Sequence, residues 1–329
     1  MRVLGIETSC DETAAAVVED GRILSNVVSS QIRLHRRFHG VVPELAARAH
    51  LQRIAAVVEA ALDGRRVDAV AFARGPGLMG PLLVGKMAAL AAAESLGCPV
   101  VAVNHLEGHV FAAELAGEIR FPLVTLIVSG GHTDLLLCRA PGRYRLLGRT
   151  RDDAAGEAYD KVARMLGLSY PGGPVIDRMA RRGDPAAVAF TRPLLPGTWD
   201  FSFAGLKTAV LYHLRGLGRP PSRREAADLC ASFQEAVVET LVRKTLAAAE
   251  SHGVKEVVVG GGVAANARLR EAFRAEARRR GLRVRLPPPI LCTDNGAMLA
   301  QTASHRLRMR RPGRRLRCDP GLGFENWAA

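Results

Sequence analysis

The amino-acid sequence predicts a two-lobed α/β protein in which one structural unit occurs twice. The first observation is a trio of short apolar segments joined by polar turns, at residues 2–29, that recurs at residues 123–150. The second is that helix-like and strand-like segments alternate after each trio, as in α/β folds. The third is a mostly helical insertion at about 154–250, in the second copy only. We therefore expect a first lobe at residues 1–118, rejoined by residues 300–329, and a second lobe at residues 119–299.

Polar turns of small residues join the predicted antiparallel strands. In the first copy these turns are Thr8-Ser9 and Asp20-Gly21, and in the second they are Ser129-Gly130-Gly131-His132 and Pro141-Gly142. Serine, threonine and glycine in such turns let backbone N–H groups approach an anion closely. One turn of this kind usually marks only a tight bend. Two in equivalent positions predict a cleft between the lobes, with a phosphate-binding hairpin on each side.

Helix–strand units follow each trio. In the first copy, Pro43 occupies a tolerated first-turn position, and we expect helices at residues 43–62 and about 81–96, with strands at 70–73 and 100–103. In the second copy we expect strands at 257–259 and 284–286, a helix through Leu269 and Phe273, and a helix from Gly296.

Composition is that of a soluble globular protein, with 48% hydrophobic and 24% charged residues. No apolar run approaches the roughly 18 residues needed to span a bilayer, so no membrane partner is expected. The first residues read as a strand rather than a signal peptide. Six cysteines without a C-x-x-C pair favour reduced thiols and a cytoplasmic protein.

The formal net charge of +14 has two interpretations. One is a polyanionic partner such as RNA, bound largely through its phosphates. The other is composition bias, because the chain has 41 arginines against 5 lysines. The densest basic cluster, with seven arginines between Arg306 and Arg317, is either a binding patch or a solvated C-terminal tail.

The segment His105-Leu106-Glu107-Gly108-His109 carries the clearest chemical signal. Two imidazoles four residues apart on a helix lie on one face and can bind one metal ion. A zinc protease has H-E-x-x-H, with its base beside the first histidine. Glu107 instead lies about 200° around the helix from His105 and should point away. The alternative is a helix with two solvated or hydrogen-bonded imidazoles.

Several motifs together resemble the TsaD family, tRNA adenosine threonylcarbamoyltransferases formerly described as sialoglycoproteases (Gcp). These motifs are Gly5-Ile6-Glu7-Thr8-Ser9-Cys10-Asp11-Glu12-Thr13, the His105/His109 pair, Ser129 to Thr133, Asp153 to Lys161, Tyr170 to Pro174, Gly205 to Ala209 and Thr293-Asp294-Asn295. The resemblance covers residue 1 to about residue 300. It implies the duplicated ribonuclease-H-like fold of actin-like ATPases, sugar kinases and heat-shock ATPases. Departures are few: Ala47 and Ala204 stand where serine is expected.

The resemblance implies that Asp294 joins His105 and His109 as a third metal ligand. Two histidines and one carboxylate suit one Fe²⁺ or Zn²⁺ ion per subunit. Taken alone, Asp294-Asn295-Gly296 reads as a turn and N-cap for the next helix.

An adenine-nucleotide site is also implied, for threonylcarbamoyl-adenylate, AMP or ATP. Its expected residues are Val128, Ser129, Gly130, Gly131, His132, Asp160, Gly173, Asp177 and Asn266. A glycine turn suits phosphate and a carboxylate suits ribose hydroxyls. The alternatives are structural: Asp160 lies four residues before Arg164, an ordinary helix-surface pair, and Gly173 ends a loop.

The expected reaction is transfer of the threonylcarbamoyl group from its adenylate to the exocyclic amine of the adenosine 3′ of the anticodon in ANN-decoding tRNAs. Asp11 or Glu12, in the first hairpin turn, is the expected base, although an exposed acidic turn is the alternative. The resemblance implies tRNA, a TsaB-like paralogue and a TsaE-like ATPase as partners. Competing hypotheses are an ATPase or small-molecule kinase of the same fold, a metalloprotease, and a non-catalytic subunit that senses nucleotide.

Overall fold

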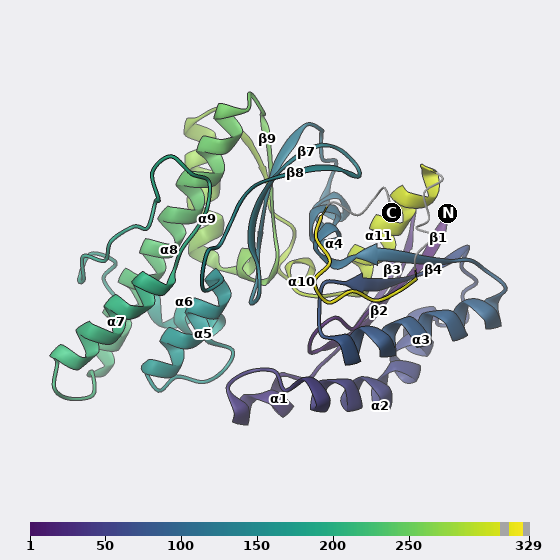
Figure 1. Cartoon of the computed structure of the whole chain (residues 1–329), viewed down its shortest axis with the longest axis horizontal. Helices are drawn as coiled ribbons and strands as arrows, with labels where there is room; N and C mark the ends of the chain where they lie inside the picture. The colour runs from purple at the N-terminus through teal and green to yellow at the C-terminus, as the bar shows by residue number, and fades with distance from the viewer. Residues whose placement is uncertain (310–315, 325–329) are drawn as a thin grey trace. The chain divides into compact units, whose positions relative to one another are not determined.

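The computed structural model describes residues 1–309 and 316–324, and the chain divides into two compact units (Figure 1). The first unit contains Met1–Glu118, the hairpin tip Pro141–Tyr144, and the described C-terminal residues from Ile290 on. The second contains Ile119–Ala140 and Arg145–Pro289. The chain thus returns to the first unit at Ile290 rather than at residue 300. Asp294 consequently belongs to the same unit as His105 and His109.

A mixed five-stranded sheet forms the centre of the first unit. Its strands are β1 (Arg2–Glu7), β2 (Glu12–Glu19), β3 (Arg22–Ser30), β4 (Ala69–Gly75) and β5 (Val100–Asn104), in the order β3-β2-β1-β4-β5. Strand β1 is antiparallel to β2 and parallel to β4, which is parallel to β5. The carboxyl ends of the three parallel strands therefore meet at one edge of the sheet, where sites form in α/β folds.

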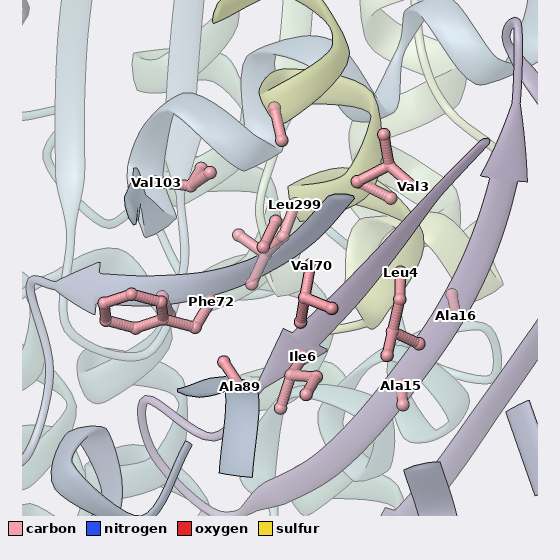
Figure 2. Packing of buried hydrophobic residues seen from close by; sticks show 14 of the residues in the cluster. Val3, Leu4, Ile6, Ala15, Ala16, Val70, Phe72, Ala89, Val103 and Leu299 are labelled. Atoms are coloured by element: carbon pink, nitrogen blue, oxygen red, sulfur yellow. The ribbon is translucent and has the colours of Figure 1, made fainter. Parts of the chain in front are cut away.

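Helices cover both faces of this sheet. The helices of this unit are α1 (Ile32–His35), η1 (Arg36–Phe38), α2 (Pro43–Leu62), α3 (Met79–Leu96), α4 (His105–Ala112), η2 (Glu114–Ala116), α10 (Pro289–Cys292) and α11 (Gly296–Arg308), and α2, α3, α4 and α11 are the ones that pack against its strands. Because both faces are covered, successive β1 residues Val3 and Leu4 are both fully buried (Figure 2). Gly5 allows α11 to approach β1 closely, since a Cβ on Gly5 would lie 2.1 Å from the carbonyl oxygen of Gly296. This approach brings the residues just before α11 to the end of β1.

The second unit repeats the same sheet. Its strands are β6 (Leu123–Val128), β7 (Thr133–Ala140), β8 (Arg143–Arg149), β9 (Glu256–Gly260) and β10 (Arg283–Arg285), in the order β10-β9-β6-β7-β8. Its helices are α5 (Ala155–Met165), α6 (Gly172–Ala180), α7 (Ala204–Gly216), α8 (Arg223–Ser251), η3 (Gly262–Ala265) and α9 (Ala267–Arg279). Strands β6 to β10 take the positions of β1 to β5, which confirms the predicted duplicated α/β fold.

Among the described residues, one helix, α3, is long and apolar enough by length and composition to cross a bilayer, with a mean hydropathy of 1.2. Lys86 and Glu94 interrupt its apolar sequence. Its buried face, which includes Leu82 and Ala89, packs in the core of the first unit (Figure 2). One face of α3 is therefore part of the core of the first unit.

Candidate metal centre and nucleotide site

The two histidines lie on α4, which begins where β5 ends. Asn104 starts the helix, because its side-chain oxygen accepts hydrogen bonds from the backbone N–H groups of Leu106 (2.8 Å) and Glu107 (3.3 Å). All eight residues of α4 are buried. The rings of His105 and His109 lie edge to face with centroids 4.9 Å apart, so the i, i+4 spacing places both on one face.

Asp294 reaches these rings from the loop between α10 and α11. Its Oδ1 lies 3.6 Å from Nε2 of His105 and 3.4 Å from Nε2 of His109. The neighbouring Asn295 caps α11 by accepting a hydrogen bond from the backbone N–H of Met298 at 3.0 Å. The segment therefore serves two purposes: Asn295 starts the helix, and Asp294 contributes its carboxylate to the histidine pair.

This donor set fits a cation. One ligand atom from each of the three side chains lies within 4.8 Å of the others. Both ring nitrogens of His109 are buried without a hydrogen-bond partner among the described residues. Burying an unpartnered polar group costs free energy, and a metal ion bound to Nε2 would offset that cost. Two imidazole nitrogens and one carboxylate oxygen match the preferences of Fe²⁺ and Zn²⁺.

Glu7 orients His105, a role to which the sequence analysis assigned no residue. Its fully buried carboxylate lies 2.8 Å from Nδ1 of His105, at the end of β1. When Nδ1–H donates to Glu7, the lone pair of Nε2 faces Asp294, as in other carboxylate–histidine–metal sites. Burial lowers the pKa of His105, but the carboxylates of Glu7 and Asp294 outweigh it and raise that pKa to about 9. The signal in the sequence was a charged residue ending an otherwise apolar strand.

Asp11 lies in the turn between β1 and β2, Glu12 begins β2, and the negative charge of Asp294 acts on both carboxyl groups. Burial, followed by the negative charge of Asp294, raises the pKa of Asp11. Burial and the neighbouring Asp11 raise the pKa of Glu12 to about 8. The ring of His50 supports the turn, with Nε2 donating to the carbonyl of Cys10 at 3.0 Å. The carboxyl groups of Asp11, Glu12 and Asp294 therefore create one region of negative electrostatic potential beside the histidine pair.

Glu107 faces another part of the first unit. Its buried carboxylate accepts hydrogen bonds from the Arg306 guanidinium (3.2 Å) and the Tyr144 hydroxyl. Glu107 thus fastens α4 to α11 and to the hairpin tip. It does not occupy the position that the general base of a zinc protease requires.

In the second unit, the predicted phosphate turn follows Val128 at the end of β6. The turn closes on itself, since the backbone N–H of Ser129 donates to the carbonyl of His132 at 2.8 Å. Gly130 and Gly131 are exposed, and nothing lies within 4 Å of where their Cβ atoms would be. The turn also contacts the start of α5, because a Cβ on Gly156 would lie 2.6 Å from the carbonyl oxygen of Ser129. Backbone around the two glycines is accordingly open to an anion.

The other predicted nucleotide residues lie on α5, on α6 and at the start of α9. Asp160 accepts a hydrogen bond from the backbone N–H of Gly172, beside Gly173 at the start of α6 (2.6 Å). Asp177 pairs with Arg181 at 3.3 Å. Asn266 caps α9 and donates its amide to Gln234 at 2.6 Å. These three polar side chains thus have structural partners as well.

A cleft of about 340 Å³ opens between α6, α8 and α9. Asp177 lines it, and so does Gln234, the partner of Asn266. The turn at Ser129 to His132 is not among its lining residues. The second unit therefore places Asp177 on the lining of this cleft, whereas Asn266 is connected to it only through Gln234 and the glycine turn lies at the end of β6.

Of the seven arginines in the basic cluster, Arg310, Arg311, Arg314 and Arg315 lie outside the described residues. Arg306 is buried against Glu107, and Arg308 pairs with Asp20 at 3.0 Å. Arg317 offers its carbonyl to Arg74. Arg306 and Arg308, at the start of this cluster, thus contribute to the fold through ion pairs.

Comparison with known proteins places these features in context. The profile of a family described as "TsaD: tRNA N6-adenosine threonylcarbamoyltransferase" matches residues 22–301. A tRNA N6-adenosine threonylcarbamoyltransferase of Symbiobacterium thermophilum is 53% identical over 98% of this chain and 96% of its own length. One from Anaeromyxobacter dehalogenans (strain 2CP-C) is 56% identical over 97% and 98%.

Among solved structures, full-length HypF in its phosphate- and nucleotide-bound form has a TM-score of 0.60 at 14% identity, covering 93% of this chain and 55% of HypF. HypF of T. kodakarensis has a TM-score of 0.62 at 16% identity, covering 94% of this chain and 48% of that protein. At these identities the likeness concerns the fold alone.

Proposed function

Because this chain belongs to the TsaD family of tRNA N6-adenosine threonylcarbamoyltransferases, we propose that it transfers a threonylcarbamoyl group from threonylcarbamoyl-adenylate to tRNA. The acceptor is the exocyclic amine of the adenosine 3′ of the anticodon in ANN-decoding tRNAs, and AMP leaves. The convergence of His105, His109 and Asp294 beside the acidic β1–β2 turn carries this proposal.

The reaction needs a proton acceptor rather than a protein nucleophile. The adenosine amine attacks the carbamoyl carbon, a C–N bond forms, and the bond from that carbon to the phosphate oxygen of AMP breaks. The amine loses one proton, which Glu12 or Asp11 accepts in its ionised form. Burial keeps the pKa of Glu12 at about 8, which suits a base at near-neutral pH.

His105, His109 and Asp294 are the residues that would hold one Fe²⁺ or Zn²⁺ ion, which when bound polarises substrate oxygens as a Lewis acid. Glu7 is a positioning residue, because it fixes the orientation of the His105 ring. Glu107 holds α4 from its other side through Arg306.

The second unit would bind the adenylate. The open glycines of the turn at 129–132 suit its phosphate, and Asp177 and Asn266 suit its nucleoside. That HypF is described in a phosphate- and nucleotide-bound form supports a nucleotide on this fold.

Partners and location complete the proposal. Residues Met79, Leu83 and Met87, spaced by four along α3, are 46%, 44% and 60% exposed, and Leu51 of α2 is 65% exposed. Exposed apolar side chains in a row mark a protein interface. We assign this α2/α3 face to a TsaB-like paralogue, with a TsaE-like ATPase as a further partner, in the cytoplasm.

The rival hypotheses explain less. A kinase or ATPase of this fold uses the glycine turns but leaves the unpartnered nitrogens of His109 without a role. A metalloprotease needs a base at the metal, whereas Glu107 is bound by Arg306 and Tyr144.

The test is transfer onto unmodified tRNA. The purified chain, its partners and threonylcarbamoyl-adenylate are incubated with an ANN-decoding tRNA, and the digested nucleosides are weighed by mass spectrometry. We expect adenosine to gain one threonylcarbamoyl group. His109→Ala should abolish this gain and lower the bound metal measured by elemental analysis.

The matched control is His305→Ala, because His305 is a partly buried histidine of the same unit that pairs with Glu114 and is not a proposed ligand. It should retain both metal and transfer. Transfer by His109→Ala at the wild-type rate would refute the role of the metal. Folded wild-type protein that forms no product with its partners would favour the ATPase or the nucleotide-sensing subunit.

A further inference from the structure

The segment between β3 and α2 exposes an unusual combination of side chains. Arg33, Arg36, Arg37, Phe38 and His39 are all exposed. The guanidinium of Arg37 lies over the ring of Phe38, 4.8 Å from its centroid, yet the Phe38 residue remains 45% exposed. We propose that this segment is the surface on which the unpaired bases of the tRNA anticodon loop stack. The inference rests on the proposed function and deepens it.

Charge favours a polyanion here. The chain carries no aspartate or glutamate between Asp20 and Glu44, and the exposed segment itself carries three arginines, Arg33, Arg36 and Arg37. Arginines beside phosphates contribute affinity through charge-assisted hydrogen bonds and release of counterions. A protein surface of this composition thus matches a nucleic-acid backbone better than an apolar protein face.

The exposed aromatic ring favours unpaired bases over a duplex. RNA is recognised mainly in single-stranded loops, where splayed bases stack on aromatic rings and on guanidinium planes. Phe38 and Arg37 offer both kinds of surface in one place. Base stacking on aromatic rings is sequence-tolerant, which suits an enzyme that accepts several tRNAs.

Buried residues hold this surface rigidly. Gln31 and His35 are fully buried beneath the exposed side chains. The backbone N–H of Gln31 donates to the carbonyl of Asp11 at 3.0 Å, and Nε2 of His35 lies 3.2 Å from the side-chain oxygen of Gln31. The backbone N–H of Val42 then donates to Nδ1 of His35 at 3.3 Å. Both ends of the segment are therefore fixed by hydrogen bonds. The segment would consequently lose little conformational entropy when RNA binds to it.

The backbone changes direction at the tip of the segment. His39 has a φ of 52°, in the left-handed region. Its backbone N–H donates a hydrogen bond to the carbonyl of Arg36, which closes η1. Non-glycine residues in this region are uncommon and persist where the surroundings hold them. This conformation ends the helical turn directly after Phe38.

The location matches the chemistry. Gln31 is hydrogen-bonded to the backbone of Asp11, and Ser30 donates to the carboxylate of Glu12 at 2.9 Å. The segment is thus the immediate neighbour of the two candidate bases. An anticodon loop seated on Phe38 would place its adenosine close to Asp11 and Glu12.

The test measures the affinity of the full chain, with its partners, for a fluorescent anticodon stem–loop RNA. Anisotropy is recorded over a range of salt concentrations. We expect Phe38→Ala to raise Kd by about ten-fold or more, with an unchanged salt dependence, because it removes stacking. Phe38→Trp should restore the affinity. Arg36→Ala should reduce the slope of log Kd against log salt by about one.

Matched controls are Tyr212→Ala, an aromatic residue 65% exposed on α7, and Arg22→Ala on β3. Both should bind RNA like the wild type. If Phe38→Ala binds RNA as tightly as the wild type, the surface is wrongly assigned. Should that variant instead keep its RNA affinity and lose a protein partner, the segment is a protein interface and the inference fails.

Transfer assayed on the same samples separates this inference from the proposed function. If product forms and RNA binding does not depend on Phe38, only the assignment of the RNA-binding surface is refuted. Phe38-dependent RNA binding without threonylcarbamoyl product supports the surface and overturns the chemistry.

Discussion

Glu7, Asp11, Glu12 and Asp294 bring negative charge to one edge of the first sheet. Three of them contact polar side chains: Glu7 binds His105, Glu12 accepts a hydrogen bond from Ser30, and Asp294 approaches both His105 and His109. Burial raises the pKa of both Asp11 and Glu12, and the charge of Asp294 raises the pKa of Asp11 further, as the charge of Asp11 does that of Glu12. At the residue scale, burial and neighbouring charges therefore set the ionisation of the Asp11 and Glu12 carboxyl groups.

The pH dependence of transfer follows from Glu12, whose pKa lies at about 8. A base acts in its ionised form, so the single-turnover rate should rise as the pH passes through about 8 and then level off. Glu12→Gln should lose most of the rate and this rise. A profile in Glu12→Gln identical to that of the wild type would exclude Glu12 as the base.

The same shift predicts the effect of Glu12 on stability. Its folded pKa lies above the ordinary value of 4.5, so the folded state holds the proton more tightly. Its favourable contribution is fully present below about pH 4.5 and is lost as pH rises towards 8. In Glu12→Gln, the free energy of unfolding measured by chemical denaturation should lack this dependence on pH between about 4.5 and 8.

At the scale of elements, helix starts place the ligands. Asn104 begins α4 directly before His105, and Asn295 begins α11 directly after Asp294. Both caps are buried, with exposures of 2% and 0%. The side chain of Asn295 also donates to the carbonyl of Thr293 at 2.7 Å, which fixes the backbone on the far side of Asp294. The same two asparagines thus cap the helices and position the neighbouring candidate metal ligands.

Asn295→Ala should therefore reduce both stability and metal affinity. Loss of an N-cap costs about 1 kcal/mol of unfolding free energy, and the freed backbone would misplace Asp294. Metal affinity, measured by competition with a chromophoric chelator, should fall by about ten-fold or more.

Ser222→Ala is the matched control, because Ser222 caps α8 in the second unit through a capping box with Glu225. It should lower the free energy of unfolding by a similar amount and leave metal affinity unchanged. Equal metal affinity in the two variants would show that the Asn295 cap is structural only.

At the scale of the whole molecule, composition distinguishes two exposed surfaces of the first unit. The segment at Arg33 to His39 is basic and aromatic, whereas the α2/α3 face is apolar, with Leu51, Leu83 and Met87 exposed. Helix α3 is apolar enough to resemble a membrane span, and its exposed side accounts for part of that apolarity. A protein partner on this face would explain why α3 remains so apolar.

Met87→Glu tests that interpretation. A carboxylate buried in an apolar interface without a partner should weaken assembly with the paralogous subunit by about 2 kcal/mol or more, roughly 30-fold in Kd. The isolated chain should remain folded, because Met87 is 60% exposed. Calorimetric titration of the two proteins measures the effect, and Tyr212→Glu on α7 is the control. Assembly unaffected by Met87→Glu would place the partner elsewhere.

The periodic patterns of the sequence were sufficient to predict the duplicated fold. Apolar alternation, turn glycines and Pro43 are local signals, and each specifies an element without reference to distant residues. The i, i+4 spacing likewise placed His105 and His109 on one helix face, and motifs alone identified the family.

Other features depended on tertiary structure. No local pattern pairs Glu7 with His105, because 98 residues separate them. Sequence patterns also assigned Asp294 to the second lobe, whereas the chain returns to the first unit at Ile290.

Local sequence by itself determined the strands, the helices, their caps and the type of each candidate ligand, because hydrogen bonding and side-chain periodicity act over a few residues. Which distant side chains meet was decided by the packing of α11 against β1, through the close approach of Gly5 and Gly296. That packing sets Asp294 beside the histidines and buries Glu107 against Arg306. Contacts of this kind arise from shape and burial across the whole unit, and no local pattern encodes them.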